Sequence, residues 1–420
     1  MSKFCCYHTP KLNIMGKHTF FSGQPILSQI INLIPKSIVD RVAQQYQADR
    51  YYKKFKTWDH LVTMLFGCFS HCNSIREMIT GLQASQNRLY HLKLVHTPRR
   101  STFADANTKR DAAVFADIYS KLTRHLLPRF PDSRSCAPNL YIVDSTTISL
   151  FSDIMNNAGR PGSNGRRKGG AKAHSVVRED HLCIEFMRIS PAASHDSPFL
   201  RDLSVPAGSY ICFDRGYNNY TLFHKWTTST THPIYFVTRL RDNAYILNQT
   251  DLQVSPDQHK AGVVSDQKVV LGNPNNSKTQ LLSARIVRFK DTKTAKIFEF
   301  LTNIDHLTGS QIADIYRRRW QIELVFKRIK QAYPLRYFYG ESINAIRIQI
   351  WAVMICDLLI QTITRGQKKK WSYSNLRAMV RIHLLSYVSL WEFLKSPEKA
   401  LLQATPIHQN QRNLFTDRGS

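Results

Sequence analysis

The hydrophobic pattern of this 420-residue chain changes its period twice. From about residue 20 to 127, apolar residues recur at every third or fourth position, as on one face of an amphipathic helix. From about 140 to 305 the pattern becomes short β-branched and aromatic runs bounded by Gly, Pro, Asn or Asp, which is typical of strands. Helical spacing returns from about residue 309. We therefore expect an α/β protein with an all-α N-terminal region and C-terminal helices.

The charge of the chain is strongly unbalanced. Lys and Arg number 58 against 30 Asp and Glu, a net charge of +28 that is spread along the whole sequence. A polyanion is the expected partner, and nucleic acid is favoured over a membrane surface because no segment reads as a lone amphipathic basic helix. The most apolar run, 350–363, is interrupted by Asp357 and Gln361 and is read as too short to cross a bilayer. We expect a soluble, cytoplasmic protein with no membrane partner.

Cysteine usage is uninformative about metals. The chain has 8 Cys but no C-x-x-C pair, so neither a zinc ribbon nor a disulfide framework is indicated. Cys68 and Cys72 are interpreted as small core residues.

Two basic stretches are candidates for contact with a nucleic-acid backbone. In "HTPRRSTFADANTKR" (96–110), Ser101 or Thr102 is the expected N-cap, so that a basic helix start would face outward as a groove-reading helix does. A solvated helix face explains this stretch equally well. The second stretch, 159–174, combines Gly residues with cations and suits a loop that moulds to a backbone, or equally a plain surface loop; its basic residues are Arg160, Arg166, Arg167, Lys168 and Lys172.

Two aspartates follow apolar runs. "NLYIVD" ends at Asp144 and "SYICFD" ends at Asp214, so each carboxylate is expected at the end or edge of a buried strand, where Asp is disfavoured. One such residue is usually a cap or turn residue. Two of them in one basic protein favour a functional site.

A single acid also stands in the basic run "YRRRWQIELVFKRIK" (316–330). At about 100° per residue, four polar side chains of this run fall within an arc of about 60°, namely Tyr316, Arg319, Glu323 and Lys330. The opposite side is apolar and is expected to face the core. Taken alone, the stripe is also explained by a solvated face in which Arg319 offsets Glu323 one turn away. The other basic residues are expected on a solvated face, and they are Arg317, Arg318, Lys327 and Arg328.

The three acids together indicate a specific chemistry. Phosphodiester cleavage with two metal ions about 4 Å apart requires converging carboxylates, because one ion activates the attacking oxygen and the other stabilises the leaving oxygen. Hard divalent ions prefer oxygen ligands, which Asp and Glu supply.

The motifs resemble those of a known family. The spacing of Tyr316, Arg319, Glu323 and Lys330 is similar to the YREK signature of bacterial DDE transposases in the family named after insertion sequence four. "DRGY" (214–217) resembles that family's D-x-G-Y element around its second Asp, and "VDSTT" (143–147) resembles the segment around its first. The resemblance covers roughly residues 138–332.

The resemblance implies a domain plan. Residues 138–332 would form an RNase H-like catalytic core with a β-rich insertion at about 241–305. An all-α N-terminal DNA-binding domain (1–130) would precede it, and a C-terminal helical region (333–420) suited to dimerisation would follow.

The resemblance also implies site residues and an activity. Asp144, Asp214 and Glu323 would bind two Mg²⁺ ions, with Mn²⁺ as a substitute, while Tyr316, Arg319 and Lys330 would hold DNA phosphates near the cleaved end. Such an enzyme binds the terminal inverted repeats of its insertion sequence, acts as an endonuclease, and joins the freed 3′-OH ends to target DNA by cut-and-paste recombination. A homodimer in a synaptic complex on the bacterial nucleoid is implied. No Trp lies between 227 and 319, which leaves the formation of a hairpin intermediate open.

Two alternatives use the same fold. One is a catalytically inactive DNA-binding protein, and the other is a structure-specific nuclease that cuts without joining. Terminal inverted repeats flanking the gene would favour transposition over both.

Overall fold

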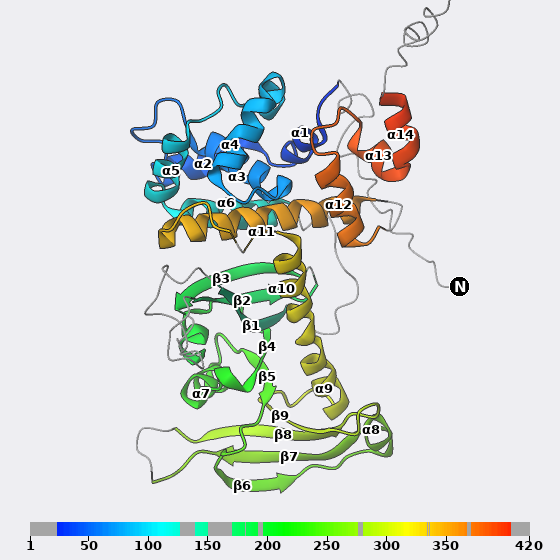
Figure 1. Cartoon of the computed structure of the whole chain (residues 1–420). Helices are drawn as coiled ribbons and strands as arrows, with labels where there is room; N and C mark the ends of the chain where they lie inside the picture. Colours follow the sequence, from blue (N-terminus) through cyan, green and yellow to red (C-terminus); the bar gives the residue numbers. More distant parts are fainter. Residues whose placement is uncertain are drawn as a thin grey trace, which may run out of the picture. The chain divides into compact units, whose positions relative to one another are not determined.

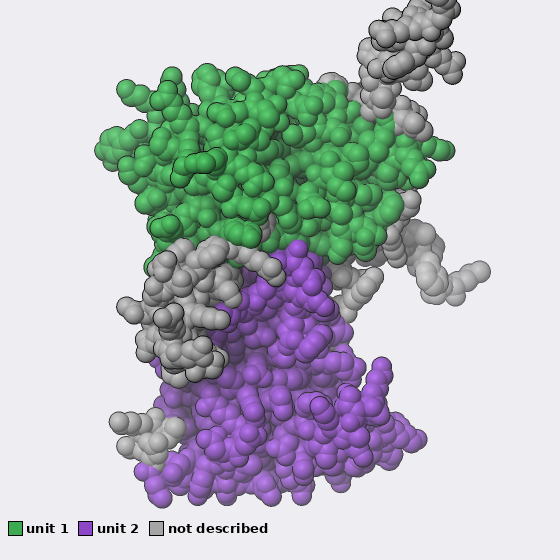
Figure 2. Space-filling view, in the orientation of Figure 1, with its two compact units in different colours: residues 1–126, 332–420 green, residues 127–331 purple. Residues whose placement is uncertain are grey.

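The computed structural model describes residues 23–126, 139–149, 170–180, 182–191, 196–275, 280–333, 335, 337–367 and 371–404. The chain divides into two compact units, which Figure 2 shows in green and purple. Unit 1 combines Met1–Leu126 with Ala332–Ser420, and unit 2 is Leu127–Gln331. The two helical regions that the sequence analysis treats as separate domains thus belong to one unit.

Unit 1 is helical within its described residues (Figure 1). Its elements from the N-terminal part are α1 (Ile26–Ile31), α2 (Lys36–Gln45), α3 (Thr57–Ser70), α4 (Ile75–Ala84), η1 (Gln86–Leu92), α5 (Arg100–Lys109) and α6 (Ala112–Leu126). Those from the C-terminal part are α11 (Ile343–Gly366), α12 (Tyr373–Ile382), α13 (Leu390–Lys395) and α14 (Pro397–Ala404).

Buried polar side chains link the N-terminal and C-terminal parts of unit 1. The Gln29 side chain on α1 donates to the carbonyl of Val388 at 2.7 Å and accepts from the amide of Leu390 at 2.8 Å. Asn107 on α5 donates to the carbonyl of Tyr339 at 2.8 Å. A buried polar group that lost such a partner would cost about 1–3 kcal/mol, so these contacts specify the pairing of the two segments.

Helix α11 is the central helix of unit 1. The helix is 24 residues long, which is longer than the apolar run 350–363. The expectation that this segment is too short to cross a bilayer is therefore wrong. By length and composition it is the one helix of the described chain that could cross a membrane, but 78% of its most apolar window is buried inside the protein. That burial is the property of a core helix, and α11 packs against α3, α5 and α6.

Two helical runs are shorter than their hydrophobic patterns suggest. The apolar pattern between residues 25 and 46 forms α1 and α2, separated by a turn that ends at Pro35, the N-cap of α2. The expected N-cap at Ser101 or Thr102 is wrong, because α5 begins at Arg100 and Arg99 is its N-cap. Arg99 takes the extended backbone (φ −73°, ψ 152°) that an N-cap needs and makes no side-chain capping bond.

Unit 2 contains one nine-stranded sheet with the order β3-β2-β1-β4-β5-β9-β8-β7-β6. Strand β1 pairs antiparallel with β2 and parallel with β4, and β4 pairs parallel with β5. The predicted runs all form strands, whose bounds are β1 (Leu140–Ser149), β2 (Gly170–Arg178), β3 (Cys183–Pro191), β4 (Tyr210–Phe213), β5 (Tyr235–Arg239), β7 (Val263–Leu271), β8 (Leu282–Lys290) and β9 (Ile297–Thr302). The edge strand β6 (Ile246–Asp251) was not predicted as a separate run, because all of its residues are exposed and its pattern does not alternate.

Helices cover both faces of this sheet, and the pleat decides which residue faces which layer. Val143, Ile211 and Phe213 belong to a core cluster shared with α7 (Tyr220–Thr228). Leu140 and Cys212 belong to a second cluster shared with α9 (Gly309–Arg318). Residues of even number on β1 and β4 therefore face α9.

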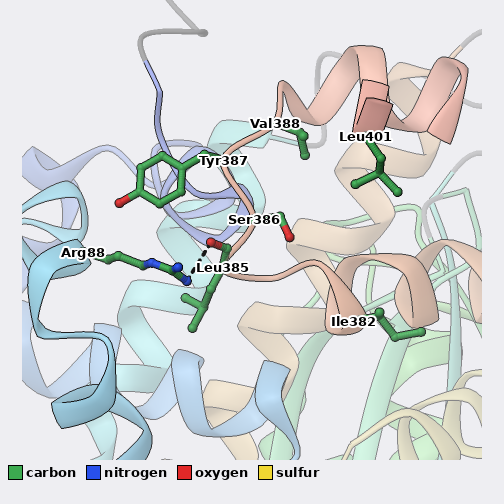
Figure 3. A pocket seen from close by; sticks show the side chains of 7 residues that line it. All are labelled: Arg88, Ile382, Leu385, Ser386, Tyr387, Val388 and Leu401. Atoms are coloured by element: carbon green, nitrogen blue, oxygen red, sulfur yellow. Dashed lines mark hydrogen bonds between the residues drawn. The ribbon is translucent and has the colours of Figure 1, made fainter. Parts of the chain in front are cut away.

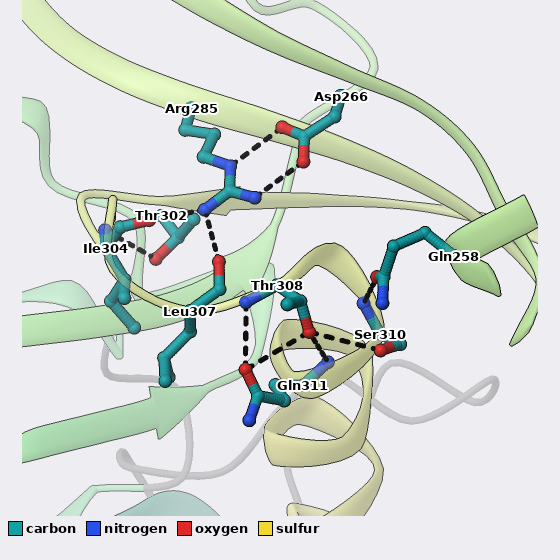
Figure 4. Close-up of polar contacts among 9 residues, drawn as sticks. All are labelled: Gln258, Asp266, Arg285, Thr302, Ile304, Leu307, Thr308, Ser310 and Gln311. Atoms are coloured by element: carbon teal, nitrogen blue, oxygen red, sulfur yellow. Dashed lines mark hydrogen bonds and ion pairs between the residues drawn. The ribbon is translucent and has the colours of Figure 1, made fainter. Parts of the chain in front are cut away.

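The segment between β5 and α9 extends the sheet by β6–β9 and carries the short helix α8 (Pro256–Ala261). A buried ion pair stabilises this segment. Arg285 on β8 donates to both carboxylate oxygens of Asp266 on β7, at 2.7 and 2.5 Å (Figure 4). The same guanidinium donates to the carbonyls of Ile304 and Leu307, just before α9. Arg285 thus sets the position at which the chain leaves the sheet to form α9.

The predicted helix at 316–330 is in fact two helices. Helix α9 ends at Arg318 and α10 (Trp320–Ala332) begins two residues later. At the junction the Arg319 amide donates to the Tyr316 carbonyl at 3.0 Å and the Ile322 amide donates to the Arg319 carbonyl at 3.2 Å. These i to i−3 bonds tighten the turn, as in a 3₁₀ segment.

Candidate active site

Strand register places Asp144 beside Asp214. The parallel pairing of β1 with β4 ends at Val143 opposite Phe213, so the next residue on each strand is an aspartate. Neighbouring strands lie about 4.8 Å apart, and the pleat turns both carboxylates toward the α9 face. Strand β1 itself continues to Ser149, so the expectation that Asp144 ends its strand is wrong; it is the neighbour β4 that ends there.

Asp214 occupies a capping position without acting as a cap. It is the N-cap residue of η4 (Arg215–Tyr217), yet its side chain makes no capping hydrogen bond. Its Oδ1 instead accepts a hydrogen bond from the Tyr316 hydroxyl at 3.3 Å. The turn-residue explanation therefore does not account for its side chain.

Arg319 bridges the two other acids. Its guanidinium donates to Asp144 Oδ2 at 2.8 Å and to Glu323 Oε1 at 2.9 Å. The side chain of Arg319 is 15% exposed, that of Asp144 18% and that of Glu323 36%. The third nitrogen, Nε, is buried and has no hydrogen-bond partner. Residues from β1, the α9–α10 junction and α10 thus meet through one cation.

The electrostatics of the site reflect the crowding of acids. The pKa of Asp144 is raised from 3.8 to about 6. Burial is the largest cause and the charges of Asp214 and Glu323 add to it, while the Ser145 amide and Arg319 lower the pKa. Burial lowers the pKa of Arg319, but the adjacent Tyr316 and the carboxylates of Asp144 and Glu323 together outweigh it, so the net shift is upward. The raised pKa of Asp144 therefore reflects mainly the loss of solvent around a carboxylate, with a smaller contribution from the two neighbouring acids.

Lys330 completes the stripe on the same side of unit 2. Its Nζ donates to the carbonyl of Thr147 on β1 at 2.7 Å, and burial lowers its pKa. Of the remaining basic residues, Arg317 and Lys327 are exposed. The solvated-face expectation is wrong for Arg318, which forms an ion pair with the buried Glu179 and is itself 21% exposed.

The basic loop lies mainly outside the described residues, which include none of Arg160, Arg166, Arg167 and Lys168. Lys172 is on β2 and is buried, with Nζ 2.5 Å from Asp196 Oδ1. Lys172 is therefore not on an exposed surface, and its ammonium forms an ion pair inside the protein.

A polar network that the sequence analysis missed lies on the opposite face of the sheet. His174 Nδ1 is 3.1 Å from the Tyr217 hydroxyl and its Nε2 is 3.0 Å from Ser190 Oγ. Burial lowers the His174 pKa to about 4, which keeps the ring neutral. Tyr217 is the last residue of "DRGY", so this network supports the turn that carries Asp214. The signal was the pair of polar residues Lys172 and His174, which alternate with small apolar residues at the start of the strand.

The hollows on the described surface include the following two. One, of about 370 Å³, is lined by Arg215, Gly216, Arg241, Asp242 and Asn243, the first of which follows Asp214 in the sequence. The other, of about 460 Å³, is in unit 1, where Arg88 donates to the Leu385 carbonyl and lies over the Tyr387 ring (Figure 3). The lining of the second contains no acid, so it offers no carboxylate ligands for a metal ion.

The donor set suits a divalent metal ion, although within the described ranges no group of three His, Cys, Asp or Glu residues is already assembled around a metal position. Asp144, Asp214 and Glu323 supply oxygen ligands only, which hard cations prefer. Arg319 stands between two of them, so a guanidinium charge occupies the position of a bridging cation. The residues fit such an ion once that guanidinium moves away.

Fold and site together define a class: a mixed α/β domain that gathers three carboxylates beside basic residues. Comparison with known proteins then identifies the family. The family described as "Transposase DDE domain" matches residues 136–359, and a "Domain of unknown function (DUF4372)" matches residues 22–93. The chain belongs to the transposase DDE domain family and is a DNA transposase.

Three relatives named as transposases agree with this assignment. A protein of Sinorhizobium fredii named as a transposase, y4zB, is 32% identical over 64% of this chain and 72% of its own length. A protein of Synechocystis named as a transposase for insertion sequence element IS4SA is 24% identical over 63% of this chain and 71% of its own. One of Geobacillus stearothermophilus, named for IS5377, is 26% identical over 63% and 66%. A solved piggyBac transposase synaptic complex with hairpin DNA aligns at a TM-score of 0.43 and 11% identity, covering 94% of this chain and 87% of that one.

Proposed function

We propose that this transposase cleaves the ends of its own insertion sequence with two divalent metal ions and joins the 3′-OH ends to target DNA. Asp144, Asp214 and Glu323 are the proposed ligands. The observation that carries the proposal is the proximity of these three acids on one face of the sheet: strand register places Asp144 beside Asp214, and Arg319 links Asp144 to Glu323. Mg²⁺ is the proposed ion, and Mn²⁺ would substitute for it.

The proposed core is RNase H-like. The strand order β3-β2-β1-β4-β5 supports this, with an antiparallel meander followed by two parallel strands. Strands β6–β9 would be the β-rich insertion expected at about 241–305. In this arrangement the first acid lies on the central strand and the second directly after its parallel neighbour.

The protein's own groups have distinct proposed roles. When bound, the two ions would activate the attacking water or 3′-OH and stabilise the leaving oxygen. The Tyr316 hydroxyl orients the Asp214 carboxylate. Arg319 holds Asp144 and Glu323 until DNA enters and then turns its guanidinium to a phosphate, for which its planar donors are suited.

Two further basic groups would position the strand. Lys330 exchanges its carbonyl partner on Thr147 for a phosphate near the cleaved end. Arg215 and Arg241 line the hollow of about 370 Å³, which would hold a neighbouring phosphate of the same backbone.

Assembly on DNA follows from the same proposal. Paired ends must be cut and joined together, so we propose a homodimer in a synaptic complex on the bacterial nucleoid. The helical N-terminal part, with its cations, would recognise the terminal inverted repeats. The C-terminal helices would contribute to dimerisation.

The test is cleavage of DNA that carries the ends of the element, with the cut positions mapped in the presence of Mg²⁺. Asp144→Asn, Asp214→Asn and Glu323→Gln should each reduce cleavage to background while leaving end binding largely intact. Asp314→Asn on α9, an acid whose side chain is 41% exposed, is the matched control and should cut normally. Retained cutting in any of the three variants would remove that residue from the site.

The alternatives give different products in the same reaction. A nuclease that only cuts would release ends without joining them to a target plasmid. An inactive DNA-binding protein would shift the DNA in a binding assay and leave it whole.

A further inference from the structure

The loop between α2 and α3 in unit 1, residues 46–56, carries an unusual concentration of exposed charge. We call it the Tyr51 loop. Tyr51 is 88% exposed, and all four cations of the loop, Arg50, Lys53, Lys54 and Lys56, are exposed as well. None of the ion pairs among the described residues involves any of these four cations. Like charges this close repel one another, so the loop is arranged for a partner that neutralises them.

The buried side chain of Arg110 anchors the backbone of the loop. This arginine is 2% exposed, and its guanidinium donates to the carbonyls of Ala48 at 3.3 Å and Phe55 at 3.0 Å. It also lies 4.3 Å from the centre of the Tyr52 ring. One buried side chain therefore ties both ends and the middle of the loop.

Two more groups complete the anchor. Asp49 Oδ1 accepts from the backbone amide and the hydroxyl of Thr57, at 2.6 and 2.8 Å, and from Arg110 at 3.4 Å. His60 is fully buried, and burial followed by the nearby Arg110 charge lowers its pKa well below 6.5. Since a guanidinium can only donate, the neutral His60 ring accepts at Nδ1 from Arg110 at 2.9 Å.

The anchored loop presents Tyr51 outward in an uncommon backbone conformation. Tyr51 has φ of +70°, a region that residues with a bulky side chain seldom adopt. The Arg50 guanidinium stacks 5.1 Å from the Tyr51 ring centre. Gln47 also has positive φ, so the loop turns sharply at both places. A hydrophobic ring is thus held in solvent, between cations, by a rigid base.

We propose that the Tyr51 loop is a DNA-binding surface, in which Lys53 and Lys54 pair with backbone phosphates and Tyr51 packs against the adjoining sugar and phosphate. Unpaired cations match the charge of duplex DNA, and Tyr hydroxyls are common phosphate donors. The surface lies within residues 22–93, the part that matches a domain of unknown function. The inference rests on the proposed function, since it takes DNA as the substrate.

The experiment measures binding of the full-length protein to a labelled duplex that carries the end of its element, by fluorescence anisotropy at several salt concentrations. A Lys53→Ala, Lys54→Ala double variant should lower the slope of log K against log salt by about 1.8, because each phosphate contact contributes about 0.9. Lys395→Ala is the matched control, as it removes an exposed cation of unit 1 that is already paired with Glu392. Its slope should equal that of the wild type.

Tyr51 gives a second readout that charge alone would not change. Tyr51→Ala should weaken end binding severalfold with an unchanged salt slope, and Tyr51→Phe should recover the part due to ring packing. Thermal unfolding of each variant checks that the loop's anchor is intact.

The possible results separate this inference from the proposed function. If the wild type binds and cuts its ends while the double variant keeps the full slope, the Tyr51 loop is not on the DNA and the proposed function stands. If the wild type neither binds nor cuts, the proposed function fails and this inference fails with it. A lowered slope together with normal cutting at saturating protein supports a binding surface separate from the catalytic acids.

Discussion

Two arginines in unit 2, Arg285 and Arg319, use their guanidinium groups in opposite ways. Arg285, in the β6–β9 region, faces one carboxylate, and its remaining nitrogen reaches two carbonyls, so each of its three nitrogens has a partner (Figure 4). Arg319, at the proposed active site, divides its two terminal nitrogens between two carboxylates of different elements and leaves Nε without a partner. The first is a closed structural pair. The second is a cation shared among more acids than it can neutralise.

The difference shows how a functional charge is recognised in a structure. Arg285 and Asp266 are 6% and 7% exposed and balance each other. Arg319 contacts two acids, Asp144 and Glu323. The pKa of Asp144 is raised to about 6, chiefly by burial. At the proposed site a cation can take the place of the Arg319 guanidinium once that side chain moves away, whereas both oxygens of Asp266 are held by Arg285 inside the fold.

The largest expected effect concerns the structural arginine. Arg285→Ala leaves Asp266 buried without a partner and should lower the free energy of unfolding by about 3–5 kcal/mol. Urea unfolding measures it. Arg288→Ala, on the same strand, breaks an exposed pair with Glu299 and should cost no more than about 1 kcal/mol. Equal losses in the two variants would contradict the assignment of Arg285 as a structural anchor.

The next largest expected effect is a pH dependence of stability at the proposed active site. Because the folded pKa of Asp144 is raised above its unfolded value, its ionisation costs stability, and this cost develops as pH rises from about 4 through about 6. Between pH 4 and 7, without divalent ions, wild type should lose up to about 3 kcal/mol relative to Asp144→Asn. Urea unfolding at both pH values tests this, with Asp314→Asn as control. A difference that stays constant with pH would show that the pKa of Asp144 is not raised in the folded protein.

The bridging role of Arg319 predicts an effect on metal binding. Removing a guanidinium that forms two charge-assisted hydrogen bonds, each contributing about 1.5–3 kcal/mol, frees both carboxylates. Arg319→Ala should therefore bind Mn²⁺ roughly tenfold or more tightly in the absence of DNA, while losing cleavage. Electron paramagnetic resonance of free Mn²⁺ measures the affinity, and Arg319→Lys is the control. Weaker binding by Arg319→Ala would mean that the arginine orders the acids for the metal.

The smallest expected effect is at Lys330. If its ammonium leaves Thr147 for a phosphate, Lys330→Ala should weaken end binding and lower the salt slope by about 0.9. Lys327→Ala, three residues earlier on an exposed position, should leave the slope unchanged. An unchanged slope in Lys330→Ala would place that residue off the DNA.

Much of the fold follows from local pattern. The strands at β1, β4 and β5 coincide with apolar β-branched runs, because a strand buried on both faces needs an apolar residue at nearly every position. Boundaries between helices were less predictable. The break at Arg319 interrupts a continuous helical pattern, and it arises from two i to i−3 bonds that periodicity does not reveal.

The candidate site divides in the same way. The identities and order of Asp144, Asp214 and Glu323 could be proposed from motifs. The internal ion pairs of Lys172 and Arg318 could not. Each is a cation in a basic stretch, yet Lys172 is paired inside the sheet with Asp196 and Arg318 with the buried Glu179. Whether a cation meets an internal acid depends on residues distant in sequence.

By itself the sequence determined the α/β composition, the excess of positive charge and the three acids in their order, since these depend on residue type and local period. The tertiary structure decided the rest. The register of β1 against β4 places Asp144 beside Asp214, the α9–α10 junction brings Arg319 between two acids, and helices from both ends of the chain share unit 1. Each of the three depends on at least one contact between segments far apart in the chain, and such contacts are selected by packing and hydrogen-bond satisfaction over the whole fold.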